Sequence, residues 1–334
     1  MTPPAPTADS VVACPPPPAA RSPHPYPGLR PFRLDESDIF FGRDEQIDSL
    51  LERLHGTRFL SVVGASGCGK SSLIGAGLVN AVRAGYLTGP APGWRVVMMQ
   101  PRDRPLANLA DGLVASGPPA HPGPDPDTAR AFLRVGLRRG PNSLLEALPT
   151  YLGCDQNLLL IVDQFEELFR FREHGNPDEA DAFAALLLAS TRSARVGVYI
   201  VLTMRSDFIG ECAVFAGLPE AVNDSQYLVP RLSREQRAEA IEGPAQLFGG
   251  SVDPALLTRL LNDLGPDPDN LPVLQHVLRR LWNRAAGRPG PPVLTLADYE
   301  AVGGVTDALA DSGIGRGWPR YCSGRWPSGP RKAD

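Results

Sequence analysis

The sequence has little cysteine and no long apolar run, and each shortage argues against a class of protein. Five of the 334 residues are cysteines, an odd number without metal-ligand spacing: Cys14, Cys68, Cys154, Cys212 and Cys322. This fits a reducing compartment better than a disulfide-stapled scaffold. No apolar stretch approaches the roughly 20 residues that a membrane-spanning helix needs. The N-terminus also lacks the basic and apolar regions of a secretory signal. We therefore expect a cytoplasmic protein without a membrane partner.

The sequence also has no excess of positively charged residues. Asp and Glu outnumber Lys and Arg by 37 to 33, and the net charge is −4. This balance gives no indication of a nucleic-acid partner. Proline, in contrast, is abundant, with 36 residues. Residues 1–25 are especially rich in it, which predicts a disordered leader, with a polyproline II docking segment as the alternative.

The central feature of the chain is a phosphate-binding motif between a predicted strand and a predicted helix. Residues 59–63 are rich in β-branched and aromatic types and predict a buried strand. A complete G-x-x-x-x-G-K-[ST] match follows, and a helix is expected over about 71–84. Backbone N–H groups of such a loop point at phosphate oxygens, and the helix start adds its positive dipole end. This Walker A motif predicts a nucleoside triphosphate site made of Gly64, Ser66, Gly67, Cys68, Gly69, Lys70, Ser71 and Ser72.

Two residues of this motif have specific expected roles. Lys70 can reach the β- and γ-phosphates, and the hydroxyl of Ser71 can hold Mg²⁺. Cys68 occupies a position that the motif leaves open. The simplest interpretation is a tolerated small side chain. The other is a reactive thiol, because a helix N-terminus and a nearby lysine both favour the thiolate.

A second strand, over residues 157–162, is apolar in its last five residues and is followed by Asp163. Such a run is typical of a central parallel strand with both faces covered, and ligands bind at the carboxyl ends of these strands. Asp163 is therefore predicted to hold Mg²⁺ opposite Ser71, as a Walker B carboxylate. Glu166 and Glu167 follow, and one of them, Glu166 in preference to Glu167, is predicted to orient or deprotonate the attacking water. The alternative for the two glutamates is an acidic helix start favoured by the helix dipole.

Three more strands are expected in the same sheet, over residues 95–100, 195–205 and 226–230. The strand at 195–205 ends in Arg205, which can sense or neutralise a γ-phosphate; a solvated strand end is the alternative interpretation. The order of these strands along the chain suggests a P-loop sheet with an inserted central strand. Helical patterns then cover 233–248, 254–264 and 273–283. We expect an NTPase core over residues 26–230 and a helical subdomain over 231–310.

Seven segments occur in order between about residues 26 and 309: PYPGLRPF, FFGRDEQI, FLSVVGASGCGKSSL, LLLIVDQFEELF, VLTMRSDF, DNLPVLQHVLRRLW and YEAVGGV. Together they resemble the novel STAND-type NTPase domain of bacteria, a relative of the NACHT and apoptotic ATPases. The resemblance implies an α/β P-loop fold of the ASCE or AAA-like kind, a parallel sheet sandwiched by helices. It also implies a slowly hydrolysing, ATP-switched signalling module in regulation or defence. Self-association, or a sensor or effector partner, would be part of that switch.

The resemblance also assigns residues. Arg43 belongs to an aromatic-Gly-Arg element that lies against adenine and ribose in the AAA-like and STAND families. Asp163, Glu166 and Glu167 fall in step with the acidic run of the NACHT proteins, and Arg205 with the sensor arginine. Pro272 matches a proline that contacts adenine, although Asn270 stands where many relatives have glycine.

Several alternatives stay open at this point. The chain could be a non-hydrolysing nucleotide-binding scaffold, or a truncated fragment of a larger STAND protein. A DNA-associated AAA-like ATPase is disfavoured by the acidic balance. Residues 311–334 show no helical or strand period, and a frameshifted or truncated, disordered end is preferred over a nucleic-acid-binding segment. The trigger, the effector and the oligomeric state do not follow from the sequence.

Overall fold

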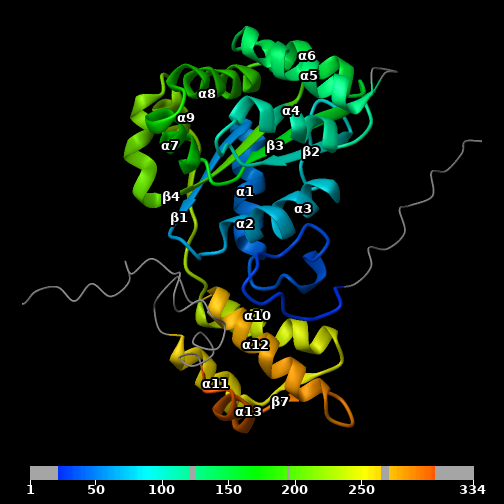
Figure 1. The fold of residues 1–334 in the computed structure, drawn as a ribbon. Helices are drawn as coiled ribbons and strands as arrows, with labels where there is room; N and C mark the ends of the chain where they lie inside the picture. Colours follow the sequence, from blue (N-terminus) through cyan, green and yellow to red (C-terminus); the bar gives the residue numbers. More distant parts are fainter. Residues whose placement is uncertain (1–21, 121–124, 194–195, 265–270, 305–334) are drawn as a thin grey trace, which may run out of the picture.

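The computed structural model describes residues 22–120, 125–193, 196–264 and 271–304. In Figure 1 the sheet and its helices form the upper part of the molecule, and helices α10 to α13 form the lower part. The leader expected over residues 1–25 lies almost wholly outside the described residues, and the tail 311–334 and Asn270 lie outside them entirely. Within the described ranges, no helix is both long and apolar enough to cross a membrane.

The upper part is built on parallel strands in the order β2-β3-β4-β1-β5. Their bounds are Phe59–Gly64 for β1, Gly93–Met99 for β2, Gln156–Val162 for β3, Val198–Arg205 for β4 and Gln226–Leu228 for β5. Strand β4 therefore lies between the strand that leads into the P-loop and the strand that ends before Asp163. This confirms the α/β P-loop fold with an inserted central strand.

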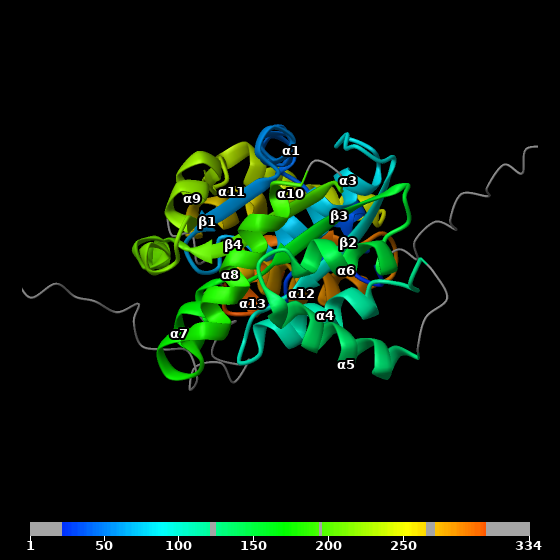
Figure 2. The same ribbon diagram turned by 90° about the horizontal axis from the view of Figure 1, so that it is seen from above.

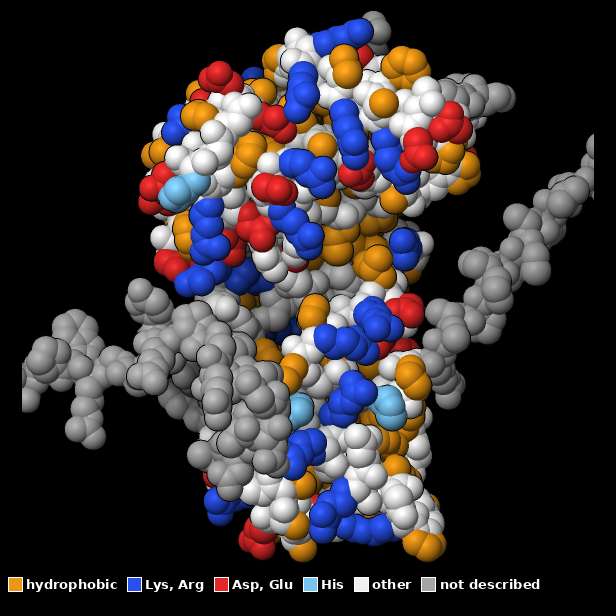
Figure 3. Space-filling view, viewed as in Figure 1, with side chains coloured by type: hydrophobic (Ala, Val, Ile, Leu, Met, Phe, Trp, Pro, Cys, Tyr) orange, Lys and Arg blue, Asp and Glu red, His pale blue; other side chains and the backbone are white. Residues whose placement is uncertain are grey.

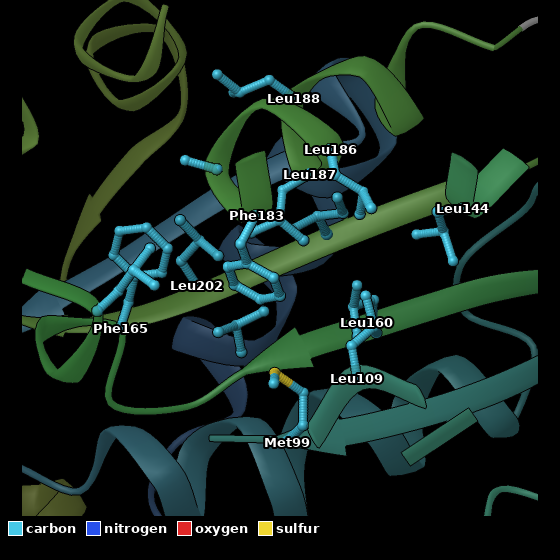
Figure 4. Packing of buried hydrophobic residues seen from close by; sticks show 14 of the residues in the cluster. Met99, Leu109, Leu144, Leu160, Phe165, Phe183, Leu186, Leu187, Leu188 and Leu202 are labelled. Atoms are coloured by element: carbon cyan, nitrogen blue, oxygen red, sulfur yellow. The ribbon is translucent and has the colours of Figure 1, made fainter. Parts of the chain in front are cut away.

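Helices cover both faces of this sheet, as Figure 2 shows with α1 and α3 on one side and α4 and α5 on the other. Alternate side chains of β3 explain why its sequence is apolar from Leu158 onward. Leu158, Leu160 and Val162 pack into one hydrophobic cluster, while Leu159 and Ile161 pack into the cluster on the opposite face. Figure 4 shows the first cluster, where Leu160 and Leu202 of the sheet lie beneath side chains of α8. A strand buried on both faces has no polar positions to spare.

The helices of the upper part follow the strands in alternation. They are α1 (Asp44–Thr57), α2 (Lys70–Ser72), α3 (Val79–Arg83), α4 (Pro105–Ala115), α5 (Pro126–Gly136), α6 (Ser143–Tyr151), α7 (Glu166–His174), α8 (Pro177–Thr191) and α9 (Leu218–Ser225), with 3₁₀ segments at Ser37–Ile39, Leu137–Arg139 and Ser206–Val214. The helix expected after the P-loop is present, but Leu73–Leu78 within it is a π-helix. Gly77 lies in this segment, and a Cβ there would come 2.9 Å from Ile47 of α1, so glycine permits this close packing.

The lower part is helical. It contains α10 (Arg234–Leu247), α11 (Pro254–Asp263), α12 (Leu271–Ala286) and α13 (Leu296–Ala301), and β6 (Ser251–Val252) pairs with β7 (Val293–Leu294). Helix α10 begins with a capping box, in which Ser233 and Gln236 bond each other's backbone N–H groups. The apolar faces of these helices form a hydrophobic cluster of their own.

Residues 22–43, termed the N-terminal segment below, connect the two parts. Tyr26 is fully buried in the hydrophobic cluster of the lower part, and its hydroxyl donates a 2.6 Å hydrogen bond to the carbonyl of Ile241. Further along, the backbone N–H of Phe32 donates to Ser72 Oγ, and Asn80 Nδ2 donates to the carbonyl of Leu34. The segment therefore contacts the helices that follow the P-loop and the helical cluster at once. The domain boundaries proposed from the sequence place Tyr26 with the NTPase core, although its packing partners belong to the lower part.

Candidate nucleotide-binding site

A cavity of about 490 Å³ lies where the loops after β1, β3 and β4 meet the N-terminal segment and the lower helices. This is the carboxyl end of a parallel sheet, where open α/β folds bind their ligands. The P-loop contributes Ser66, Gly67, Gly69, Lys70, Ser71 and Ser72 to the lining. The segments after β3 and at the end of β4 contribute Asp163, Gln164, Glu166, Glu167, Arg170, Thr203 and Arg205. Figure 3 shows the molecule narrowing between its upper and lower parts, at the level of this junction.

The P-loop begins at the last residue of β1. Gly67 and Gly69 have φ values of +70° and +92°, which only glycine adopts without strain. These turns reverse the chain directly into α2, which starts at Lys70. The ammonium of Lys70 curls back and donates to the carbonyls of Gly64 and Ala65, at 2.8 and 2.7 Å. The loop thus holds the ammonium group of Lys70 at the N-terminal end of α2, where it would lie close to the negative charge of a bound phosphate.

Ser71 and Asp163, which the sequence placed opposite each other, are in direct contact. Ser71 Oγ donates to both carboxylate oxygens of Asp163, at 2.9 and 3.1 Å. Thr203, at the end of β4, donates its hydroxyl to Asp163 Oδ1 at 2.6 Å and accepts the N–H of Gln164. The inserted strand therefore fixes the orientation of the carboxylate. Gln164 turns the chain with a φ of +58° immediately afterwards.

The donor set at this position fits a magnesium ion. A hydroxyl and one carboxylate are hard oxygen ligands, and Mg²⁺ is commonly held by one or two such groups while phosphate oxygens and waters fill the rest of its shell. Both side chains line the cavity beside Lys70. Ser71 and Asp163 are thus the residues that would hold the ion.

The structure distinguishes the two glutamates after Asp163. Glu166 is 8 % exposed and lines the cavity, and its Oε2 has no hydrogen-bond partner among the described residues. Burial raises the pKa of its carboxyl, an effect that the charge of Lys70 partly offsets. Glu167 instead accepts the backbone N–H of Arg102 at 3.1 Å. Both glutamates line the cavity, but Glu166 has a buried oxygen without a partner among the described residues, whereas Glu167 bonds the neighbouring loop.

Two arginines stand at the rim of the same end of the cavity. Arg205 pairs with Asp207 at 2.5 Å, so it is held by a neighbour on its own loop. Arg170, which the sequence analysis did not single out, is exposed on α7 one turn after Glu166. The guanidinium groups of Arg205 and Arg170 lie 5.7 and 5.8 Å from the ring of Phe208. The i to i+4 spacing between Glu166 and Arg170 is the signal that could have found it.

Arg43 and Cys68 both have structural surroundings. Arg43 is 4 % exposed and donates to the carbonyls of Cys68 and Pro230, at 3.1 and 2.9 Å. It lines the cavity, but its guanidinium holds the P-loop to the segment after β5. Cys68 is 6 % exposed and its side chain joins the hydrophobic cluster on that face of the sheet. This position favours the interpretation of Cys68 as a small packing residue over that of a reactive thiol.

The opposite wall of the cavity comes from the N-terminal segment and the lower helices. Pro272 lies there at the start of α12, next to Leu271 and near Leu274 and Gln275. Phe41 also lines the cavity, and Gly243 of α10 gives it room, because a Cβ at that glycine would come 2.7 Å from the ring. The sequence analysis predicted Pro272 and Arg43 in this wall but not Phe41 or Gln275.

Comparison with known proteins supports this description. No curated protein matches the sequence significantly. The ORC2 protein of Aeropyrum pernix, solved in complexes with ADPNP and ADP, has a TM-score of 0.52 and 17 % identity over 81 % of this chain and 67 % of its own. The Walker-type ATPase of Pyrococcus abyssi has a TM-score of 0.50 and 14 % identity over 85 % and 74 %. At these identities the likeness shows the fold alone.

The family assignment rests on the sequence itself. Residues 25–313 match the family described as Novel STAND NTPase 1, a span that covers most of the chain and includes the P-loop, Asp163, Arg205 and Pro272. The match therefore joins the upper part, the N-terminal segment from residue 25 and the lower helices in one family unit. This chain belongs to the family of novel STAND NTPases.

Proposed function

We propose that this P-loop NTPase binds ATP with Mg²⁺ and hydrolyses it, and that the two nucleotide states switch the contact between its upper and lower parts. The observation that carries the hydrolytic role is the carboxyl group of Glu166. It is buried beside Lys70 and Asp163 and has an oxygen without a partner among the described residues. A raised pKa in such a place suits a general base.

Each residue at the phosphate end has a distinct proposed role. Lys70 offsets the charge of the β- and γ-phosphates, and Arg205 adds a second positive charge at the rim. Ser71 and Asp163 hold the metal, which when bound neutralises phosphate charge. Thr203 positions Asp163, and Glu166 accepts a proton from the attacking water. Phosphate contacts come from the backbone N–H groups of the P-loop and the start of α2.

The switching role follows from the position of the cavity. Its lining combines the P-loop and strand ends of the upper part with Leu232, Ala240, Leu271 and Leu274 of the lower part. A ligand that contacts both parts can shift the populations of two arrangements of these parts. The size of the shift is set by the difference between its affinities for the two arrangements. We propose that ADP favours a closed monomer and that ATP, together with a trigger, favours an assembly-competent form. This proposal includes the division of the chain into an NTPase core, residues 26–230, and a helical subdomain, residues 231–310.

The hydrolytic role is tested by three variants of the full chain. Lys70→Ala should lose nucleotide binding, because the charge held against phosphate is gone. Glu166→Gln should bind ATP and show turnover at least about a hundredfold lower, since a general base contributes roughly 10²–10⁴. Glu167→Gln is the matched control and should keep most of its turnover, because its carboxylate bonds a backbone N–H instead. Phosphate release and nucleotide affinity are the measurements.

The outcomes separate the competing functions. Equal turnover in Glu166→Gln and the parent would remove Glu166 from the mechanism. ATP binding without turnover in the parent would favour the non-hydrolysing scaffold. Stimulation of turnover by DNA would favour the DNA-associated ATPase.

A further inference from the structure

The guanidinium group of Arg205, at the rim of the cavity, is bound by a carboxylate of the protein itself. Its Nε donates to Asp207 Oδ1 at 3.1 Å, and its Nη2 donates to Asp207 Oδ2 at 2.5 Å. Two parallel bonds of this kind are also the geometry in which a guanidinium binds a phosphate group. A phosphate that binds Arg205 in this way would therefore have to replace Asp207.

Asp207 lies within electrostatic reach of the phosphate end of the cavity. The pKa of its carboxyl is lowered, mainly by the hydrogen bonds from Arg205 and to a smaller extent by the positive charge of Lys70. Lys70 and Arg205 both line the cavity, whereas Asp207 does not. Asp207 can therefore act on a ligand in the cavity in two ways, through its hold on Arg205 and through its negative charge.

The segment that follows Arg205 keeps Asp207 beside it. Residues Ser206–Val214 form a 3₁₀ segment. Within it the ring of Phe208 stacks on Phe169 of α7, with the ring centroids 6.1 Å apart and the planes inclined by 3°. The guanidinium of Arg205 lies 5.7 Å from the centroid of the same Phe208 ring. The pair is thus positioned by contacts within the protein.

The exposure of the pair makes it easy to replace. The side chains of Arg205 and Asp207 are 41 % and 54 % exposed. An ion pair so accessible to water contributes little stability, so a competing anion has little to overcome. The terminal phosphate of a triphosphate is such an anion, and a diphosphate lacks it.

We propose that Asp207 competes with the γ-phosphate of a bound triphosphate for Arg205, and that this competition sets how strongly the site prefers triphosphate over diphosphate. The inference rests on the proposed nucleotide function and adds a residue that regulates it. A diphosphate leaves the pair of Arg205 and Asp207 intact. A triphosphate takes over the guanidinium, and breaking the pair offsets part of the affinity that the γ-phosphate contributes.

Asp207→Asn tests the proposal, because it keeps the shape of the side chain and removes its charge. The affinity for adenylyl imidodiphosphate, a triphosphate that resists hydrolysis, should rise about threefold to fivefold, as expected when an exposed ion pair no longer has to be broken. The affinity for ADP should stay close to that of the parent. Calorimetric titration of the full chain in the presence of Mg²⁺ measures both affinities, and thermal melting shows that each variant folds.

Asp181→Asn is the matched control. Asp181 binds the guanidinium of Arg172 through the same two nitrogens, Nε and Nη2, at 2.8 and 3.5 Å. Neither residue lines the cavity. This variant should therefore keep the parent's ratio of triphosphate to diphosphate affinity.

A double variant separates competition from simple repulsion between Asp207 and the γ-phosphate. If repulsion alone is at work, Asp207→Asn should raise the triphosphate affinity equally in an Arg205→Ala background. Competition predicts that the rise disappears in that background, because no guanidinium is left to be released.

The outcomes also separate this inference from the proposed function. If the parent binds neither nucleotide, both fail. If the parent binds both nucleotides and Lys70→Ala binds neither, but Asp207→Asn keeps the parent's ratio of affinities, the inference alone is overturned. A rise of equal size in Asp181→Asn, or one that persists in the Arg205→Ala background, overturns it too.

Discussion

At Glu166 the protein keeps an ionisable carboxyl with one oxygen that has no hydrogen-bond partner in the part of the chain that the structure describes. The charged form is disfavoured by burial, and the pKa is raised. The sequence predicted that one of two adjacent glutamates would act on water, with Glu166 preferred and Glu167 as the alternative. Glu166 lies three residues after Asp163 and Glu167 lies four residues after it, and the contact that distinguishes Glu167, from the backbone N–H of Arg102, comes from a distant part of the chain. Such a long-range contact leaves no local signal in the sequence.

The raised pKa has a consequence for stability. A carboxyl whose pKa is higher in the folded state destabilises the fold once it is ionised, and this effect fades as pH falls toward its ordinary value. Glu166→Gln should therefore melt at a higher temperature than the parent at pH 8. The difference should shrink as pH is lowered toward about 4.3, the ordinary pKa of a glutamate. Melting scans across that range are the measurement, and a pH-independent difference would contradict the burial of a charge.

The same shift predicts the acid limb of turnover. Because a general base must be ionised, the rate should fall as pH drops through the raised pKa, with a midpoint above about 4.3.

At the scale of elements, most of the sheet and its helices could be predicted from the sequence. Runs such as 158–162 are apolar because both faces of the sheet are covered, and the strand order followed from the P-loop class. Helix α8 had no predicted counterpart. Leu186, Leu187 and Leu188 are consecutive and all buried, because α8 packs against the sheet on one side and other helices on the rest. A helix with apolar side chains on most of its circumference has only a weak amphipathic period to detect.

The cavity shows the same limit. The P-loop, Asp163 and Arg205 were predictable because motifs mark them, whereas Gln275 and Phe41 enter the cavity through the packing of segments far apart in the chain. The short β6–β7 pair likewise joins residues about forty positions apart. Tertiary contacts of this kind determine which residues of the N-terminal segment and the lower helices line the cavity, and local sequence patterns do not encode these contacts.

One element of the lower part depends on a single carboxylate. Asp298 in the first turn of α13 accepts from Thr295 and pairs with Arg284 and Arg288. Its interaction with Arg288, together with the other two, lowers its pKa to about 2. We expect Asp298→Asn to cost about 1–3 kcal/mol of unfolding free energy at pH 7. Because the pKa is depressed, that stabilisation is present above the ordinary value of about 3.9 and is lost as pH falls toward 2.

Urea unfolding at pH 7 and at pH 2.5 measures the effect of Asp298→Asn. The control is Asp181→Asn, which breaks a 2.8 Å pair between Arg172 and a half-exposed aspartate. Exposed pairs contribute little, so this variant should stay within about 1 kcal/mol of the parent. Similar losses in both variants would show that Asp298 has no special place in the helical part.

At the scale of the whole molecule, the N-terminal segment decides how the two parts are joined. Its contacts reach Ile241 and Arg279 on one side and Ser72 and Asn80 on the other. It also supplies part of the lining of the cavity. A nucleotide in the cavity would therefore contact the segment, the P-loop and the lower helices together. Changes in the segment should appear in nucleotide affinity as well as in stability.

Tyr26→Phe tests this connection. The variant keeps the ring in contact with Trp282 and removes the 2.6 Å hydrogen bond to Ile241. We expect a loss of about 1 kcal/mol in unfolding free energy and an affinity for ADP lower by up to about fivefold. Tyr86→Phe is the matched control, because Tyr86 is 75 % exposed. If the two variants behave alike in melting and titration, the segment does not couple the parts.

The position of this segment also orders events while the chain is being made. Pro27 leaves the ribosome early, but the guanidinium that binds its carbonyl belongs to Arg279, 252 residues later. At about 5–20 residues per second, that interval is roughly 10–50 s. Within that interval the strands of the sheet are completed, the last of them at Leu228, while the ring of Tyr26 still has no helical cluster to enter. A nascent chain should thus be able to bind the phosphates of a nucleotide before the lower helices complete the cavity. Nucleotide binding that depends on the lower helices should begin only after α12 has been synthesised.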